Sequence, residues 1–330
     1  MRTKALLILA FVLLVATTGC DKITFQTHKD GGGDGALTQD ELCDSNEGMD
    51  FSFEKSQPPG EVDTGDSIYI SFSLANKGCS DTEGALLQMT GLDTEKIVLT
   101  QYYFDNINMK GKSQTNPWGD ILTLSTDGII IGADPAKKID AVNMYAFLCY
   151  PYTTTASADI CISPRKDTPV ELAPESCKHG NVRLDPTQGG PVVVHNVETR
   201  LIDSNYGRKM QLNIYLKNRG NGKVVPATQG QCFGDALVTL EEVAFGDYSL
   251  STEGANRITC GRGEGPVTIK LSEDSNNMIK CIVDLYETGP SYTSPLYMRI
   301  SYGYRLTKQQ RIAINNLNYQ GEEVEREPEE

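Results

Sequence analysis

The chain has 330 residues and carries 30 Lys and Arg against 44 Asp and Glu, a formal net charge of −14 at pH 7. A protein with this excess of acid does not attract nucleic acid or anionic lipid, so we expect neither as a partner. The length suffices for two ordinary domains, and 39% hydrophobic residues indicate a folded chain rather than a disordered one.

The first twenty residues, MRTKALLILAFVLLVATTGC, predict export. A positively charged start precedes an apolar run, Ala5–Ala16, which is too short to cross a membrane and is typical of a signal peptide. The ending at Cys20 resembles a lipobox, after which prokaryotic lipoproteins are cleaved and lipidated, although Thr17 stands where Leu is usual. We therefore predict a signal peptide over 1–19 and a lipid on Cys20 that anchors the protein to the outer face of the cytoplasmic membrane.

Residues 20–47 are polar and rich in glycine, and we expect them to form a flexible tether between the lipid and the first domain. Within the tether, Asp30–Glu41 has the acid spacing of an EF-hand calcium loop, with Gly35 at the sixth position. Gly32 replaces the third ligand, and the flanking segments are poor helix formers. These departures favour a tether over a calcium site, so we predict no metal and no cofactor.

Alternation of apolar and polar residues begins after Met49 and indicates β-strands. Ser67–Ala75 (SIYISFSLA) and Lys209–Lys217 (KMQLNIYLK) each place their large apolar side chains on one face. An ungapped shift of the first segment onto the second superimposes Asn76-Lys77-Gly78 on Asn218-Arg219-Gly220. Asn and Gly tolerate positive φ, so a sharp turn is expected after each strand. The match indicates an internal repeat with one copy in each half.

Further alternating segments predict strands throughout both halves. In chain order they are Ile129–Ile131, Met144–Tyr150, Asp159–Ile162, Val267–Leu271, Ile279–Leu285 and Leu296–Leu306. Outside the signal peptide, no segment repeats apolar residues at helical spacing for three turns. This pattern predicts an all-β protein made of two tandem Ig-like antiparallel β-sandwiches.

The boundaries of the predicted domains follow from changes in composition. We place the first sandwich at 48–162 and the second at 191–317. Residues 163–190, rich in Pro, Gly and charge, would connect them. Residues 318–330 end in GEEVEREPEE, with six Glu against one Arg, and predict an acidic disordered tail.

These features resemble the CARDB-type and related Ig-like modules of prokaryotic cell-surface proteins, many of them archaeal. The resemblance rests on the strands that end in Asn-x-Gly and on two segments, CYPYTTTASADICI (Cys149–Ile162) and QGGPVVVHNVE (Gln188–Glu198). It covers residues 49–315. The resemblance implies adhesion, spacing or assembly at the cell surface, and it supplies no catalytic residues.

Nine cysteines are present, and assigning Cys20 to the lipid leaves eight, an even number that predicts disulfides in an oxidising compartment. No Cys-x-x-Cys pair occurs, which disfavours zinc-ribbon and thioredoxin-type sites. Cys149 and Cys161 bracket a segment that reads as a hairpin loop, and Cys260 and Cys281 lie in two short predicted strands. We take these four as the leading disulfide candidates, each pair closing a small loop.

The remaining cysteines leave the pairing open. Cys79 follows the first Asn-x-Gly turn and is expected to reach Cys43 or Cys177. Cys232 has no evident partner. Eight cysteines allow 105 pairings, and the sequence does not choose among them.

Residues typical of catalysis form no recognisable pattern. The sequence has no Gly-x-Ser-x-Gly, no His-x-x-x-His and no P-loop. The histidines are His28 in the tether, His179 in the connector and His195 in a predicted strand, where a structural role is the favoured interpretation. We therefore predict that the protein is not an enzyme.

Two aromatic segments are open to a structural or a binding interpretation. Trp118, the only tryptophan, lies in the turn-like Asn116-Pro117-Trp118-Gly119, and we expect it to close the open end of a sandwich. The alternative is an exposed Trp that stacks on a sugar or docks on a partner. Tyr102-Tyr103-Phe104 has the same two interpretations.

The functional expectation is an exported, lipid-anchored cell-surface protein that acts without catalysis. It would adhere to a protein partner or assemble with further copies through loops and free sheet edges. The alternative is a solute- or ligand-capturing lipoprotein accessory to a transporter, but such proteins are mostly α/β. A secreted hydrolase is a third class, and it needs convergent acids or a His-based pair that the sequence does not show.

Overall fold

The computed structural model describes residues 39–163, 177–204, 207–227, 232–246, 257–261, 265–272, 277–285 and 291–320. The signal peptide, Cys20, His28, nearly all of Asp30–Glu41 and the end of the acidic tail lie outside the described residues, so the predictions made for them stay predictions. Every described element belongs to one compact unit, residues 37–330. No described helix is long and apolar enough to span a membrane.

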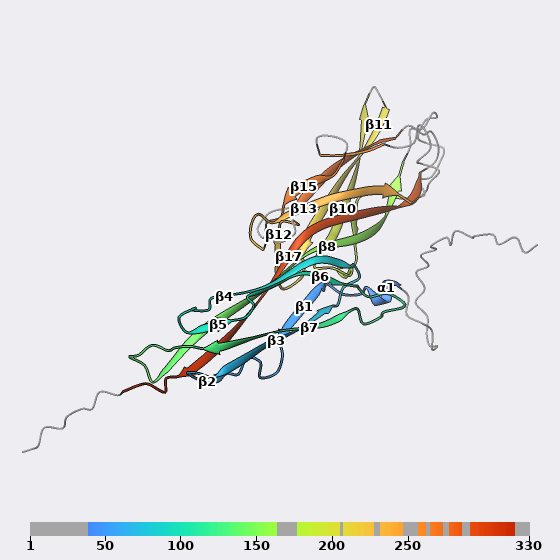
Figure 1. The fold of residues 1–330 in the computed structure, drawn as a ribbon. Coiled ribbons are helices and arrows are strands. Elements are labelled where there is room, and N and C mark those ends of the chain that lie inside the picture. The colour runs from blue at the N-terminus through green and yellow to red at the C-terminus, as the bar shows by residue number, and fades with distance from the viewer. Residues whose placement is uncertain are drawn as a thin grey trace, which may run out of the picture. The chain divides into compact units, whose positions relative to one another are not determined.

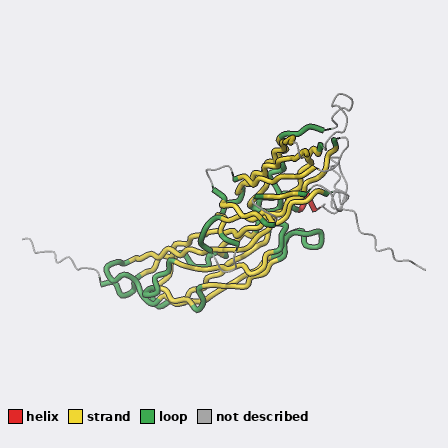
Figure 2. Tube along the Cα trace, turned by 90° about the horizontal axis from the view of Figure 1, so that it is seen from above, coloured by secondary structure: helices red, strands yellow, loops and turns green. Residues whose placement is uncertain are grey.

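Strands form most of the described chain and loops nearly all of the rest (Figure 2), beside one four-residue helix, α1 (Gln39–Leu42). One four-stranded sheet has the order β1 (Met49–Phe53), β3 (Ser67–Asn76), β7 (Ile121–Ile130), β5 (Ile97–Leu99). A five-stranded sheet has the order β14 (Ile258–Cys260), β16 (Met278–Leu285), β11 (Gly207–Asn218), β10 (Val192–Ser204), β9 (Asn181–Arg183). The alternating segments Ser67–Ala75 and Lys209–Lys217 are strands β3 and β11, as predicted.

An eight-stranded sheet joins the two halves of the chain. Its order is β15 (Val267–Lys270), β13 (Leu237–Phe245), β17 (Tyr292–Asn315), β8 (Ile139–Ile162), β4 (Thr82–Thr90), β6 (Tyr103–Met109), and β12 (Lys223–Val225) and β2 (Glu61–Asp63) also pair with β17. All of these pairs are antiparallel except the one between β17 and β2. The described chain is therefore an all-β protein of antiparallel sheets, which confirms the predicted class.

Strands β8 and β17 have 24 residues each and pair along their whole length (Figure 1), from Ile139 opposite Asn315 to Ile162 opposite Tyr292. β4 pairs only with the first half of β8, and β13 pairs only with the first half of β17. The second half of each long strand therefore lies beside the first half of the other. Each half of the chain thus donates a strand segment to the sheet region built by the other half.

The strand order supports the internal repeat. Read inward from its two edges, the eight-stranded sheet runs β6-β4-β8 on one side and β15-β13-β17 on the other. The turn bonds also match, because Asn76 Nδ2 donates to the Ser80 carbonyl at 2.9 Å and Asn218 Nδ2 donates to the Gly222 carbonyl at 3.0 Å. In both turns the backbone N–H two residues later donates back to the Asn side chain. The two Asn-x-Gly motifs are therefore equivalent Asx-type turns.

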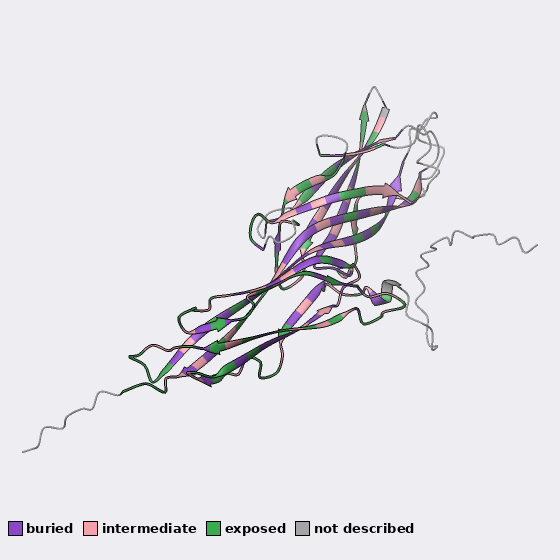
Figure 3. Ribbon diagram, viewed as in Figure 1, coloured by how far each residue is buried: buried purple, intermediate pink, exposed green. Residues whose placement is uncertain are grey.

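Four tyrosines pack together near the middle of the paired strands β8 and β17. Tyr150, Tyr152, Tyr302 and Tyr304 are buried, and the rings of Tyr150 and Tyr304 lie 5.8 Å apart between centroids. The hydroxyl of Tyr152 accepts a bond from Ser80 N, and that of Tyr304 accepts one from Gly222 N, so each ring holds one Asn-x-Gly turn. Burial raises the pKa of Tyr152 and Tyr304. Buried residues alternate with less buried ones along most of both long strands (Figure 3), and all four rings belong to one apolar core.

The described cysteines form four disulfides, joining Cys43 to Cys79, Cys149 to Cys232, Cys161 to Cys177, and Cys260 to Cys281. The expected pairing of Cys149 with Cys161 is wrong. No hairpin separates these residues, since β8 is one continuous strand that holds them about 40 Å apart at the usual rise per residue. Cys260 and Cys281 pair as expected, because β14 and β16 are neighbours that place them directly opposite each other.

Candidate functional site

Trp118 is the most exposed large hydrophobic residue of the described chain, with 81% of its surface accessible. It lies in the loop between β6 and β7 and does not close a sheet end, so the structural interpretation given to it from the sequence is wrong. The physical reason lies in its neighbour. A Cβ atom on Gly119 would stand 1.9 Å from the Asn76 carbonyl oxygen, so the loop meets the end of β3 through glycine backbone rather than through the indole.

Hydrogen bonds hold the backbone on both sides of Trp118. Ser113 and Asn116 exchange backbone bonds of 3.0 Å, and Gly119 N donates to the Asn116 carbonyl at 3.1 Å. The Asp120 carboxylate accepts from Lys110 N at 2.7 Å and from Asn116 Nδ2 at 3.0 Å. These contacts order the Trp118 turn, residues 113–120, before any partner arrives, which lowers the entropy lost on binding.

The surroundings of Trp118 combine apolar and polar groups. Ile121, the first residue of β7, is also exposed, as are Gln114 and Thr115. Lys110 pairs with Asp81 at 2.7 Å beside the turn, and that hydrogen bond lowers the pKa of Asp81. An exposed indole with an aliphatic neighbour and a polar rim is the composition of a protein-binding hot spot. The Asn-Pro-Trp-Gly signal is readable in the sequence, but the close approach of Gly119 to the Asn76 carbonyl at the end of β3 is not, because it is a long-range contact.

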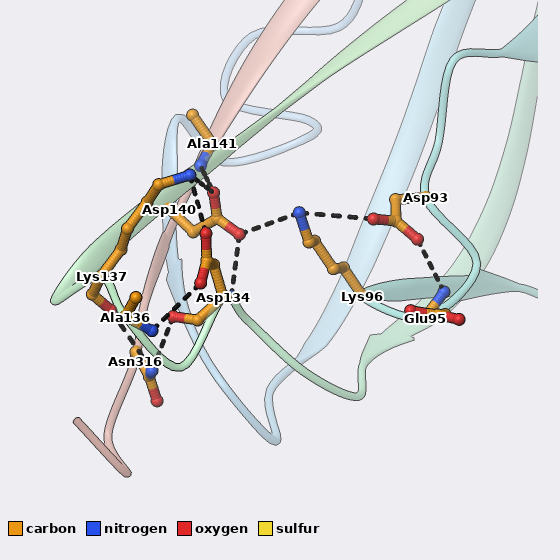
Figure 4. A network of polar contacts seen from close by, with 9 residues as sticks. All are labelled: Asp93, Glu95, Lys96, Asp134, Ala136, Lys137, Asp140, Ala141 and Asn316. Carbon is orange, nitrogen blue, oxygen red and sulfur yellow. Dashed lines mark hydrogen bonds and ion pairs between the residues drawn. The ribbon is translucent and has the colours of Figure 1, made fainter. Parts of the chain in front are cut away.

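A second polar cluster lies where β8 begins (Figure 4). The buried Asp140 carboxylate accepts from Lys96 Nζ at 3.0 Å, from Asp134 N at 3.0 Å and from Ala141 N at 2.8 Å. Burial alone would raise the pKa of Asp140, but these donors outweigh it and lower the pKa to about 2. Asn316 Nδ2 donates to the Asp134 carbonyl at 3.1 Å, so the cluster fastens the end of β17 to the loop before β8.

The carboxylates of this cluster are paired with lysines, so the cluster stabilises the fold. Lys96 also pairs with Asp93 at 3.3 Å, and Lys137 pairs with Asp134 at 2.9 Å, so ammonium groups already occupy the space between the carboxylates. Within the described ranges, no group of three or more His, Cys, Asp or Glu side chains is placed to hold a metal ion.

The other residues singled out from the sequence lie apart from the Trp118 turn. His195 in β10 packs edge-on against Tyr215 at 6.0 Å, and burial lowers its pKa. His179 Nε2 lies 2.8 Å from the Ser163 hydroxyl. In the Tyr102-Tyr103-Phe104 segment the Tyr102 hydroxyl accepts a bond from Leu99 N and Phe104 packs on the core, whereas Tyr103 faces solvent.

Comparison with known proteins assigns no family. No family model matches the chain, and no curated protein does. The secreted serine protease VesC from Vibrio cholerae is similar at 10% identity and a TM-score of 0.19, over 80% of this chain and 52% of that one, so the chain spans about half its length. The CupB6 tip adhesin from Pseudomonas aeruginosa is similar at 10% identity and a TM-score of 0.17, over 82% of this chain and 99% of that one. Such scores carry no inference about fold or function.

Proposed function

We propose that this is an exported cell-surface protein, anchored by a lipid on Cys20, that binds a protein partner or further copies of itself without catalysis. The observation that carries the proposal is Trp118, exposed on a turn whose backbone is fixed by Gly119 and Asp120. An exposed indole contributes little to the free energy of folding. We therefore infer that Trp118, the only tryptophan of the chain, contacts the surface of a partner.

The disulfides support the proposed location. All eight described cysteines are paired, and structural disulfides persist in oxidising compartments outside the cytoplasm. The signal-like segment 1–19 points to the same compartment. We assign the protein to the outer face of the cytoplasmic membrane, reached by the tether 20–47.

We further propose that the two halves are tandem Ig-like sandwiches of the CARDB-type class, each completed by a strand segment from the other. The matching Asx turns and the mirrored strand order support this. In such an arrangement the long β8–β17 pair couples the halves, so the Trp118 turn is presented from a stiff support. If the partner is a second copy of this protein, the exposed edge strands of the sheets would pair with those of the neighbouring copy.

Photo-cross-linking in intact producing cells tests the proposal. A photoreactive amino acid at Thr115, an exposed position within the turn, should yield one dominant adduct, either with another surface protein or with a second copy. Trp118→Ala should abolish that adduct, while Tyr69→Ala, which removes another exposed aromatic residue on β3, should leave it unchanged. An adduct that survives Trp118→Ala, or no adduct from position 115, contradicts the assignment.

A further inference from the structure

The outward side of the five-stranded sheet carries an excess of positive charge, although the chain as a whole has a net charge of −14. Its inward side is fixed by burial, because Val197, Ile214 and Ile279 stand next to one another in register and are buried. Alternate residues point the opposite way, and we call the surface that they form the basic face. Its charged residues are Arg183 of β9, Glu198 and Arg200 of β10, Lys209 and Lys217 of β11, and Lys280 and Asp284 of β16.

Charged residues around the basic face do not cancel this excess. Within two residues of the strand ends, the described chain adds two cations and one acid, Arg219, Arg257 and Asp185. Asp203 and Arg208, on the inward side of β10 and β11, bind each other at 2.7 Å. The basic face and its ends therefore hold seven cations against three acids in the described ranges.

Most of these cations have no acid bound to them. Asp284 pairs with Lys209 at 2.7 Å. Glu198 accepts hydrogen bonds from Asn213 Nδ2 at 3.0 Å and from the Tyr215 hydroxyl at 3.1 Å instead of forming an ion pair. Within the part of the chain that the structure describes, no carboxylate forms an ion pair with five exposed cations: Arg183, Arg200, Lys217, Arg219 and Lys280. The basic face is therefore open to an acidic partner.

The chain itself contains a segment of the opposite charge. Residues 321–330 (GEEVEREPEE), which we call the acidic segment, hold six Glu against one Arg. In an extended conformation alternate residues share a side, which would align four glutamates: Glu323, Glu325, Glu327 and Glu329. Ten extended residues span at most ~35 Å. β11 spans ~27 Å from Lys209 to Lys217, so the segment and the face match in length as well as in charge.

The acidic segment is too short to lie along the basic face of its own molecule. Cys260 of β14 lines one cavity with Val243, and Val243 pairs with Met298 of β17. Met298 lies about 56 Å from Asn315, the end of β17, at the usual rise per residue. Leu317 is still bonded near that end, and the residues that follow it, up to the end of the acidic segment, span at most ~45 Å. A second copy is therefore needed to supply the segment.

We propose that the basic face binds the acidic segment of a second copy of this chain, whose glutamates pair with Arg183, Lys217 and Lys280. Each copy has one basic face and one acidic segment, so the contact is head-to-tail. Head-to-tail contacts build rings or open chains of copies. This inference goes beyond the proposed function, because it assigns a second surface and its occupant and shares no residue with the Trp118 turn.

Sedimentation velocity of the full-length protein in non-ionic detergent tests this inference. We expect association that increases with protein concentration at 0.15 M salt, where the Debye length is ~8 Å, and is lost at 1 M, where it is ~3 Å. Lys217→Glu with Lys280→Glu should weaken association about tenfold, and so should Glu325→Lys with Glu327→Lys. The matched control, Lys55→Glu with Lys308→Glu, reverses two exposed cations outside the basic face and should leave association unchanged.

Mixing the two weakened variants tests the head-to-tail geometry. One keeps the acidic segment and the other keeps the basic face, so the mixture should form pairs that do not grow further, whereas each variant alone should stay monomeric. A mixture that stays monomeric overturns the inference. So does association that survives either pair of charge reversals.

Other occupants give different results. A wild-type protein that stays monomeric but binds phosphatidylglycerol vesicles through Lys217 and Lys280 would show that the basic face binds lipid, and the inference would be wrong. Association that is abolished by Trp118→Ala and kept by both charge reversals would support the proposed function and overturn the inference. The two proposals therefore fail separately.

Discussion

Gly119 and Trp118 are adjacent, but Gly119 packs against the fold whereas Trp118 is exposed to solvent. Gly119 has a φ of +70° and brings the loop against the Asn76 carbonyl, a position that any side chain would block. Trp118 makes the neighbouring exposed surface. The fold therefore requires glycine at position 119, whereas the side chain at position 118 is available to bind a partner.

Substitution of these two residues should separate stability from binding. Gly119→Ala should lower the free energy of unfolding by about 3 kcal/mol, since it combines a clash with backbone and a strained φ. Trp118→Ala should change it by less than about 0.5 kcal/mol, as for an exposed site. Urea denaturation of both variants measures this. A large loss for Trp118→Ala would mean that the indole is structural after all.

Asp140 should make the protein sensitive to acid. Its pKa lies near 2 in the folded state, below the usual value of 3.8, so its carboxylate stabilises the fold above pH 4. That contribution, about 2 kcal/mol from the size of the shift, is lost as the pH falls from 4 towards 2. Asp140→Asn should therefore be less stable than wild type at pH 7 and nearly equal to it at pH 2.

The matched control for this prediction is Asp93→Asn, which removes the more exposed carboxylate bound to the same Lys96. It should change the unfolding free energy little at either pH, because exposed ion pairs contribute little. A stability difference between wild type and Asp140→Asn that is the same at pH 7 and pH 2 would contradict the role given to this carboxylate.

At the scale of elements, the local sequence pattern predicts where strands lie, but it does not predict which strands pair across the chain. The alternation of Ser67–Ala75 and Lys209–Lys217 locates β3 and β11, and the shared Asn-x-Gly turns predict equivalent ends. The continuity of β8 was missed, because Pro151 and the adjacent polar residues resemble a turn. Pro151 lies opposite Gly303 of β17 and beyond Cys149, the last β8 residue paired with β4, and prolines in sheets occur at such edge positions.

The candidate site likewise combines a signal that is local in the sequence with contacts that are long-range. The turn around Trp118 is recognisable in the sequence, but its packing against the Asn76 carbonyl, which is distant in the chain, is not. Phe233 carried no signal in the sequence. It packs against Phe147 because Cys232 pairs with Cys149 across the two halves, whereas spacing alone favours a pairing within one half.

The disulfides should differ in their contribution according to the chain that each one closes. Cys149–Cys232 spans 83 residues and Cys161–Cys177 spans 16. Loop-closure entropy gives about 4.5 kcal/mol for the first and about 3 kcal/mol for the second. Replacing each pair by serines and measuring urea denaturation should show the larger loss for Cys149–Cys232. Equal losses would argue against a link across the two halves.

At the scale of the whole molecule, the paired long strands predict that the two halves fold together. A fragment of residues 39–162 lacks the 303–315 segment of β17 that covers the first half of β8. We expect this fragment to be unfolded by circular dichroism and to gain structure when a second fragment, 177–320, is added. A cooperative unfolding transition of 39–162 alone would contradict the strand exchange.

Mass spectrometry of the protein taken from its own cells and digested without reduction tests the central claim, a surface-anchored protein of an oxidising compartment, most directly. The account predicts a mature chain that begins at Cys20 with a lipid attached. It also predicts disulfide-linked peptides that join Cys43 to Cys79, Cys149 to Cys232, Cys161 to Cys177, and Cys260 to Cys281. Free thiols at these cysteines, together with an uncleaved segment 1–19, would contradict it.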